Sequence, residues 1–153
     1  MQANIINPFL TASIDLFSQM FGVQAEPGSA YVIKDQIHHR WEISGVLGIT
    51  GDHQGIVAFR LPRLLADKLL EKSGVKTANE KDRKDMVNGM VGELTNIIAG
   101  NASNKFEEHD LDISPPVVII GEHHEIAWPK IGPVVGIPFN TSFGPFEINV
   151  CLK

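Results

Sequence analysis

The stretch that decides the fold covers residues 86–102 and reads MVNGMVGELTNIIAGNA. A helix turns by roughly 100° per residue, so apolar side chains spaced three and four apart fall on one stripe. This spacing predicts a helix that ends near residue 104 and begins just after Thr77 and Glu80, which have the spacing of a capping box. Its core-facing stripe consists of Val87, Met90, Val91, Leu94 and Ile98.

A second stripe on the same helix carries Gly89, Glu93, Asn96 and Gly100, centred roughly 130° round from the apolar one. Glu93 and Asn96 are three apart, so their carboxylate and carboxamide are neighbours on one surface. A glycine costs about 1 kcal/mol relative to alanine inside a helix, but it lets another backbone approach closely. The stripe is typical of a docking surface, and also of a solvated helix face whose glycines serve packing.

The sequence on either side of this helix predicts an α+β fold. We expect a mainly antiparallel sheet of about six strands, with this helix and two others packed on it. Helix followed by three strands occurs twice, which indicates two similar halves in a single domain of residues 1–153. The other helices are expected at residues 4–21 and 62–74, and the strands at residues 30–33, 39–50, 55–61, 113–121, 125–139 and 143–152, with a hairpin turn at 51–54.

Composition and charge exclude several classes of protein. Apolar residues make up 43% of the chain, the net charge is -5, and Lys and Arg form no dominant stripe, which argues against nucleic acid as a partner. No apolar run approaches the roughly 20 residues that span a bilayer, and the first residues lack a secretion signal. The single cysteine, Cys151, offers neither a disulfide nor a zinc site. We expect a cytoplasmic protein that contacts no membrane.

The sequence also predicts that this chain binds no metal and no cofactor. Neighbouring histidines on a strand point to opposite faces, so each adjacent pair offers at most one ligand to a site. The chain has neither a Gly-x-Ser-x-Gly elbow nor a phosphate-binding Gly-Lys-Ser/Thr loop. We therefore expect strand-end or turn positions for the six histidines, which are His38, His39, His53, His109, His123 and His124.

The segment GELTNIIAGNA, residues 92–102, resembles the active-site helix of the CheX branch of the CheC/CheX/FliY phosphatases. That family's signature is Glu, two residues, Asn, in the context Gly-Glu-x-x-Asn-x-x-x-Gly-Asn. The likeness covers nearly the whole chain: residues 45–59 resemble the family's hairpin, residues 115–121 its proline and following strand, and residues 7–9 its usual opening.

The resemblance implies a CheC/CheX-like fold and a phosphatase that accelerates hydrolysis of the phosphoaspartate of a CheY-like response regulator. It assigns Glu93 and Asn96 as catalytic residues. From the bare stripe itself we expect Gly89, Gly92 and Gly100 to be partner-docking positions. Asn96 would orient the attacking water, and Glu93 would pair with a lysine of the regulator. Mg²⁺ would sit in the partner's phosphorylation site, and the family also implies a homodimer.

A different class of function is the main alternative. The family's fuller pattern places Asp or Ser four residues before the glutamate, whereas this chain has Gly89 there. The protein would then be a non-catalytic receiver-binding or flagellar-switch-associated module that has lost turnover. In either case only one site is expected, because the first helix contains no Glu-x-x-Asn.

Overall fold

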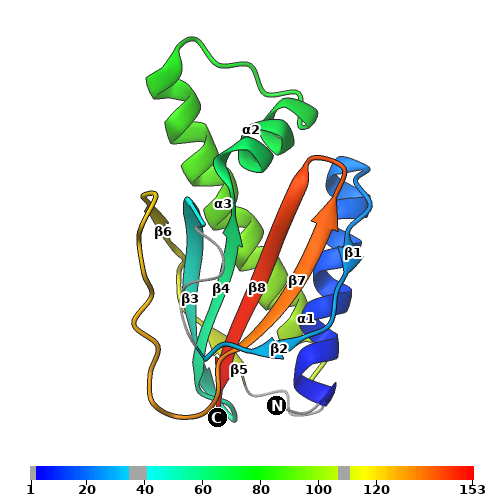
Figure 1. Ribbon diagram of the computed structural model, residues 1–153, viewed down its shortest axis with the longest axis vertical. Coiled ribbons are helices and arrows are strands. Elements are labelled where there is room, and N and C mark those ends of the chain that lie inside the picture. The colour runs from blue at the N-terminus through cyan, green and yellow to red at the C-terminus, as the bar shows by residue number, and fades with distance from the viewer. Residues whose placement is uncertain (1–2, 35–40, 107–110) are drawn as a thin grey trace.

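The computed structural model describes residues 3–34, 41–106 and 111–153. It shows an eight-stranded sheet, antiparallel in every pairing, with α-helices on one face, which confirms the predicted α+β class (Figure 1). Eight strands replace the expected six, because a short first strand was not expected and residues 113–121 contribute to two strands. His38, His39 and His109, with the start of the expected strand 39–50, lie outside the described residues.

The sheet order is β1-β7-β8-β4-β3-β5, with β2 also paired to β7 and β6 to β3. The helices are α1 (Ala3–Leu16), extended by a π-helical turn (Phe17–Phe21), α2 (Arg63–Lys72) and α3 (Glu80–Ser103). The strands are β1 (Glu26–Pro27), β2 (Tyr31–Val32), β3 (Ile43–Gly51), β4 (Gly55–Leu61), β5 (Leu111–Ile113), β6 (Val117–Ile120), β7 (Val135–Thr141) and β8 (Gly144–Leu152).

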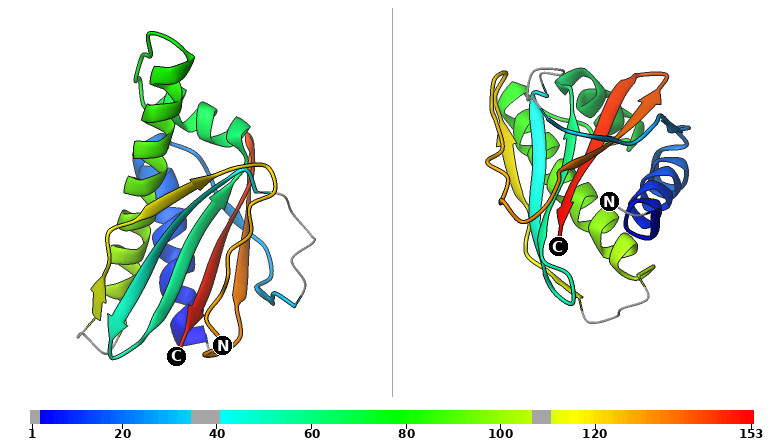
Figure 2. Two further views of the ribbon diagram at one scale, coloured as in Figure 1. Left: turned by 90° about the vertical axis from the view of Figure 1, so that its left-hand side faces the viewer. Right: turned by 60° about the horizontal axis from the view of Figure 1, so that its bottom comes forward.

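Prolines explain where the observed strands depart from the expected ones. The expected strand 113–121 is interrupted at Pro115 and Pro116, because proline cannot donate to a strand ladder. The expected strand 125–139 is wrong up to residue 134, where prolines recur and the chain instead crosses the sheet face opposite the helices (Figure 2). There the Cys151 thiol contacts the carbonyl oxygens of Pro129 and Gly132 at 3.7 and 3.8 Å.

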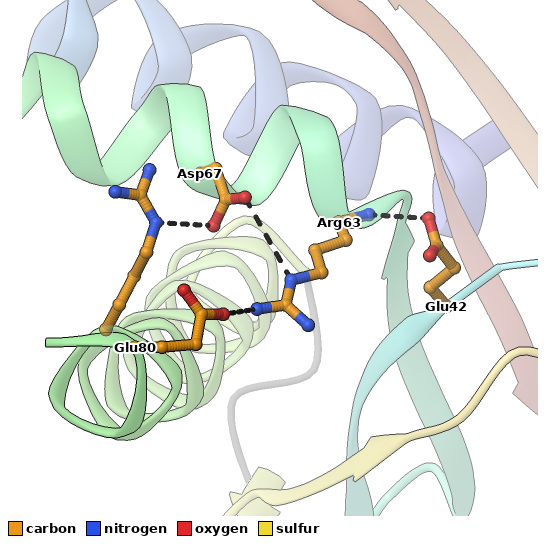
Figure 3. A network of polar contacts seen from close by, with 5 residues as sticks. Glu42, Arg63, Asp67 and Glu80 are labelled. Atoms are coloured by element: carbon orange, nitrogen blue, oxygen red, sulfur yellow. Dashed lines mark hydrogen bonds and ion pairs between the residues drawn. The ribbon is translucent and has the colours of Figure 1, made fainter.

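The start of α3 differs from the expected capping box. Asn79, not Thr77, is the N-cap, and its side-chain oxygen accepts the Asp82 N–H at 2.8 Å. Glu80 is instead paired with the Arg63 guanidinium at the start of α2 (Figure 3). Because Pro62 offers no side-chain cap to α2, the Glu42 carboxylate accepts the Arg63 backbone N–H at 3.0 Å.

These contacts tie α2 and the start of α3 to the sheet. Asp67 on α2 accepts the Arg83 Nε–H from α3 at 3.1 Å, and Glu42 immediately precedes β3 (Figure 3). Three carboxylates thus hold the starts of α2 and α3 together: Glu42 before β3, Asp67 on α2 and Glu80 on α3. Such partly exposed ion pairs contribute modestly to stability, so their main effect is to orient the helices.

The core-facing stripe of α3 is as predicted, and one strand comes unusually close to it. Val87, Val91, Leu94 and Ile98 are buried, and Met90 is half-buried against the core. An ideal Cβ on Gly45 of β3 would lie 1.9 Å from Thr95 Oγ1 and 3.3 Å from the Val91 carbonyl oxygen. Only a residue without a side chain allows this approach, so Gly45 sets the distance between α3 and the sheet.

The helices α1 and α3 share one local feature. Thr95 of α3 is buried, and its hydroxyl donates to the carbonyl oxygen of Val91, four residues back, at 2.7 Å. Ser13 of α1 is also buried and donates to the Phe9 carbonyl oxygen at 2.8 Å. Both hydroxyls therefore satisfy themselves within their own helix, on the face that packs into the core.

A polar network that no sequence pattern predicted lies on the other face of the sheet. Glu147 is 3% exposed, and its carboxylate accepts the Tyr31 O–H at 2.6 Å and the Asn149 side-chain N–H at 2.7 Å. The network continues through Arg60 and the buried Ser44 hydroxyl to His124, in the segment that crosses this face. It satisfies polar groups that would otherwise be costly to bury.

We predict that Gly45→Ala destabilises the protein by several kcal/mol, because the new methyl group overlaps Thr95 and forces α3 away from β3. Urea denaturation of both proteins measures the difference. Gly48→Ala on the same strand is the matched control, since its Cβ would meet the Ser114 Oγ at an ordinary 3.5 Å. Equal losses for the two variants would contradict the prediction.

We predict that Tyr31→Phe lowers the free energy of unfolding at pH 7 by about 1 kcal/mol, because the hydrogen bond to Glu147 is lost. Burial, then the hydrogen bond to Glu147 and its charge, raise the pKa of Tyr31 above its ordinary value of 10.0. A raised pKa means that the folded state holds the Tyr31 proton more tightly than the unfolded state does. The protonated hydroxyl therefore makes its full contribution to the free energy of unfolding below pH 10, and this contribution falls as the pH rises further. Denaturation curves across that alkaline range should therefore show a smaller loss for Tyr31→Phe than for the wild type, and parallel losses would refute this assignment.

Candidate functional site

Glu93 and Asn96 lie on the side of α3 that faces away from its buried stripe. Glu93 is exposed and Asn96 is half-buried, one helical turn further on. Neither side chain makes a hydrogen bond or an ion pair with another residue in the described ranges. A carboxylate and a carboxamide therefore stand side by side with their hydrogen-bonding groups available to another molecule.

The helix is held in this orientation from three sides. Its buried stripe and Thr95 press on the sheet at Gly45, and the carboxyl-terminal half of α3 packs against α1, as the T-shaped contact between Phe9 and Phe106 at the end of α3 shows. On the remaining side lie β5 and β6, which pair with the outer edge of β3. Along the middle of the helix Glu93 is exposed and Asn96 is half-buried, and Figure 2 shows β5 and β6 running beside α3.

The three glycines of the predicted docking surface lie in different surroundings. Gly89 is exposed, and a Cβ added there would meet nothing within 4 Å. Gly92 is buried, and its Cβ position lies 3.4 Å from Val118 Cγ2 and 3.7 Å from Pro116 Cγ. Gly100 is half-buried, with Ile113 Cδ1 at 3.9 Å. Gly92 and Gly100 thus let α3 pack closely against β6 and β5, whereas Gly89 leaves bare surface beside Glu93.

Glu93 and Asn96 line neither of the two hollows found among the described residues. These hollows, of about 310 and 130 Å³, lie between α1 and Phe106, and between α2, α3 and Ile120. A small molecule would have little to hold it on such an open helix face. The geometry instead suits a reaction whose substrate pocket belongs to a partner macromolecule.

The described histidines do not gather into a metal site. Among residues 3–34, 41–106 and 111–153, no three His, Cys, Asp or Glu side chains are placed to share an ion. His124 lies in the polar network beside Ser44, 2.7 Å from its hydroxyl, and His53 packs edge-on against Phe106. In the same part of the chain, no helix is both long enough and apolar enough to cross a bilayer.

Comparison with known proteins identifies the family of this chain. The sequence model described as Chemotaxis phosphatase CheX matches residues 43–140. No protein with curated annotation matches. A CheC-like superfamily protein from Shewanella sp. PV-4 is 27% identical, with a TM-score of 0.88 over 100% of this chain and 99% of that one.

Two further solved structures share the fold along its whole length. The chemotaxis protein CheX from Desulfovibrio desulfuricans is 32% identical, with a TM-score of 0.84 over 97% of this chain and 99% of that one. The CheX of a CheX-CheY-BeF3-Mg²⁺ complex from Borrelia burgdorferi is 24% identical, with a TM-score of 0.83 over 99% of each chain. Since the family match spans more than half of the sequence and includes the helix segment of Glu93 and Asn96, the chain belongs to the chemotaxis phosphatase CheX family.

Proposed function

We propose that this protein accelerates hydrolysis of the phosphoaspartate of a CheY-like response regulator. The observation that carries the proposal is the exposed Glu93 beside the half-buried Asn96 on one helix face, with neither side chain bonded to another described residue. Membership of the CheX family supports it, and the Borrelia relative of the same fold was solved bound to CheY. The partner supplies the phosphorylated pocket, and this chain adds side chains to it.

Asn96 orients the attacking water in this proposal. Phosphoryl transfer depends mainly on positioning and on stabilising charge, and the partner's Mg²⁺ already neutralises the phosphoryl oxygens. The carboxamide of Asn96 both donates and accepts hydrogen bonds, so it can hold a water in line with the bond that breaks. This chain then needs no metal or cofactor of its own.

Glu93 holds the partner in register. A carboxylate brought near a phosphoryl group would repel it, so Glu93 is better suited to pair with a cation on the partner, such as the lysine that the family resemblance implies. Its exposure leaves it able to reach across an interface. The open surface at Gly89, one turn before Glu93, allows the partner backbone to come close to α3.

One observation favours the alternative of a binding module without turnover. Where the family pattern has Asp or Ser, Gly89 provides no side chain to hydrogen-bond at the site, and nothing in the described surroundings fills its place. The exposed surface would then bind a receiver domain without hydrolysing its phosphoaspartate. The two functions differ in turnover and not in binding.

We predict that Asn96→Ala lowers the accelerated hydrolysis rate about 100-fold while partner affinity stays within twofold, because only the water-orienting group is removed. Glu93→Ala should raise the concentration needed for half-maximal rate as well as lower the rate. Release of phosphate from a receiver phosphorylated with a small phosphodonor measures both, over a range of phosphatase concentrations.

The matched control is Asn88→Ala, which removes an exposed carboxamide from another side of the same helix. It should leave rate and affinity unchanged. Equal acceleration by the wild type and Asn96→Ala would exclude the proposed role of Asn96. Binding of the receiver by the wild type without any acceleration would establish the binding module instead.

We also propose that two copies associate through β6. In the described part of the chain this strand pairs on one side only, with β3, and it exposes 63% of Val117 and 51% of Ile120. A free apolar edge of this kind is a template for pairing with another strand, and a second copy offers an identical one.

We predict that Ile120→Lys converts the dimer to a monomer, because a lysine on a strand edge opposes pairing. Light scattering coupled to size-exclusion chromatography measures the mass in solution. Leu64→Lys, which alters a 69% exposed leucine on α2, is the control and should remain dimeric. A monomeric wild type at micromolar concentration would refute the association.

A further inference from the structure

We propose that the segment joining β5 to β6, residues 114–116, positions the carboxamide of Asn96, with Ser114 as the residue that fixes the segment. This inference rests on the proposed function, because it concerns how the water-orienting group is held. Ser114 is a positioning residue in this scheme, and it contacts neither the phosphoryl group nor the water.

The packing of α3 places Asn96 alongside this segment. Gly92 abuts Pro116 and Val118, and Gly100, two turns further on, abuts Ile113. Asn96 lies one turn from each glycine and between them around the helix axis, so it faces residues 114–116. The half-buried state of Asn96 agrees with a position beside this segment. Glu93, which is turned further from β6, is exposed.

Ser114 anchors the segment to the sheet by two hydrogen bonds to one residue. The Ser114 backbone N–H donates to the Gly48 carbonyl oxygen at 2.9 Å, and the Gly48 N–H donates to the Ser114 hydroxyl oxygen at 2.7 Å. Gly48 belongs to β3, the strand on which α3 rests through Gly45. The helix α3 and the segment beside Asn96 are therefore both fixed to the same strand, β3.

The rest of the segment has little freedom of its own. Pro115 and Pro116 have restricted φ angles, and the chain re-enters the ladder immediately afterwards, with Val117 opposite Val46 and Val118 opposite Gly45. A segment held at both ends and stiffened between them forms a rigid wall. The Asn96 side chain accordingly loses the rotamers that would swing it towards β6.

A restricted carboxamide matters for the rate more than for binding. An in-line water must be held within a narrow range of positions, and a misplacement of about 1 Å can reduce a rate by on the order of 100-fold. Partner affinity depends on the whole docking surface, of which Asn96 is a small part. Loosening the wall should therefore reduce kcat and leave KM nearly unchanged.

The test compares Ser114→Ala with Ser114→Thr, which keeps a hydroxyl to accept the Gly48 N–H. Thr141→Ala is the matched control, because Thr141 also accepts a backbone N–H, from Phe143 at 3.1 Å, but in the β7–β8 turn. The first readout is kcat and KM for a phosphorylated receiver. The second is ¹⁵N relaxation of the Asn96 side-chain amide in the free protein, assigned by its absence from Asn96→Ala, with the buried Asn149 amide as reference.

We expect Ser114→Ala to lower kcat about tenfold with KM within twofold, and to make the Asn96 amide more mobile while the Asn149 amide is unchanged. Ser114→Thr and Thr141→Ala should behave like the wild type in both readouts. An unchanged Asn96 amide in Ser114→Ala, or a rise in KM with kcat preserved, would overturn the inference. If Asn96→Ala hydrolyses as fast as the wild type, the proposed function fails, and the relaxation measurement still decides separately whether the segment holds Asn96.

Discussion

The contact between Gly45 and Thr95 is the constraint on which the arrangement of the molecule depends. With a Cβ position only 1.9 Å from the threonine hydroxyl oxygen, β3 and α3 can meet at this distance only because residue 45 has no side chain. Thr95 is buried there and bonded within its own helix, so it cannot rotate away into solvent. Glu93 and Asn96 flank Thr95 in sequence, and fixing the direction of Thr95 into the sheet turns them outward.

The second face of the sheet shows how a layer can be covered without helices. Between β6 and β7 the chain crosses this face in an irregular path without strand pairing. Side-chain hydrogen bonds hold this segment to the sheet, and Ile126, which is 7% exposed, is buried there. Glu147 and Ser44 are buried there because Tyr31, Arg60 and His124 satisfy them. A polar cover of this kind leaves the helical face free for the site, while the sheet between them stays rigid.

Periodicity predicted the parts of the fold in which one physical pattern dominates. The strand Gly55–Leu61 was predicted with its exact bounds, and four of the five predicted stripe residues of α3 are buried while Met90 is half-buried, because each pattern is a local periodicity of apolar side chains. The cap of α3 and residues 125–134 were predicted wrongly, since Glu80 is drawn to Arg63 on another helix and prolines interrupt the ladder. The family motif located Glu93 and Asn96, but it gave no sign that Gly92 packs under Pro116, because that contact joins residues distant in sequence.

In the proposed function, a site built on an open helix face divides the chemistry between two molecules. A pocket in this chain would have to carry its own charges to stabilise a phosphoryl group, and buried charges are costly unless they are paired. The described site contains one exposed carboxylate and one half-buried amide, with a bare position at Gly89 and close packing against β6 and β5 at Gly92 and Gly100. Under the proposed function, such a surface has little to offer a phosphoryl group alone, and the partner brings the metal and the bond to be broken. If that function holds, specificity for the partner lies in the fit of the whole helix face. The close packing at Gly45 and Gly92 and the anchoring of the β5–β6 segment at Gly48 would then serve recognition as well as catalysis.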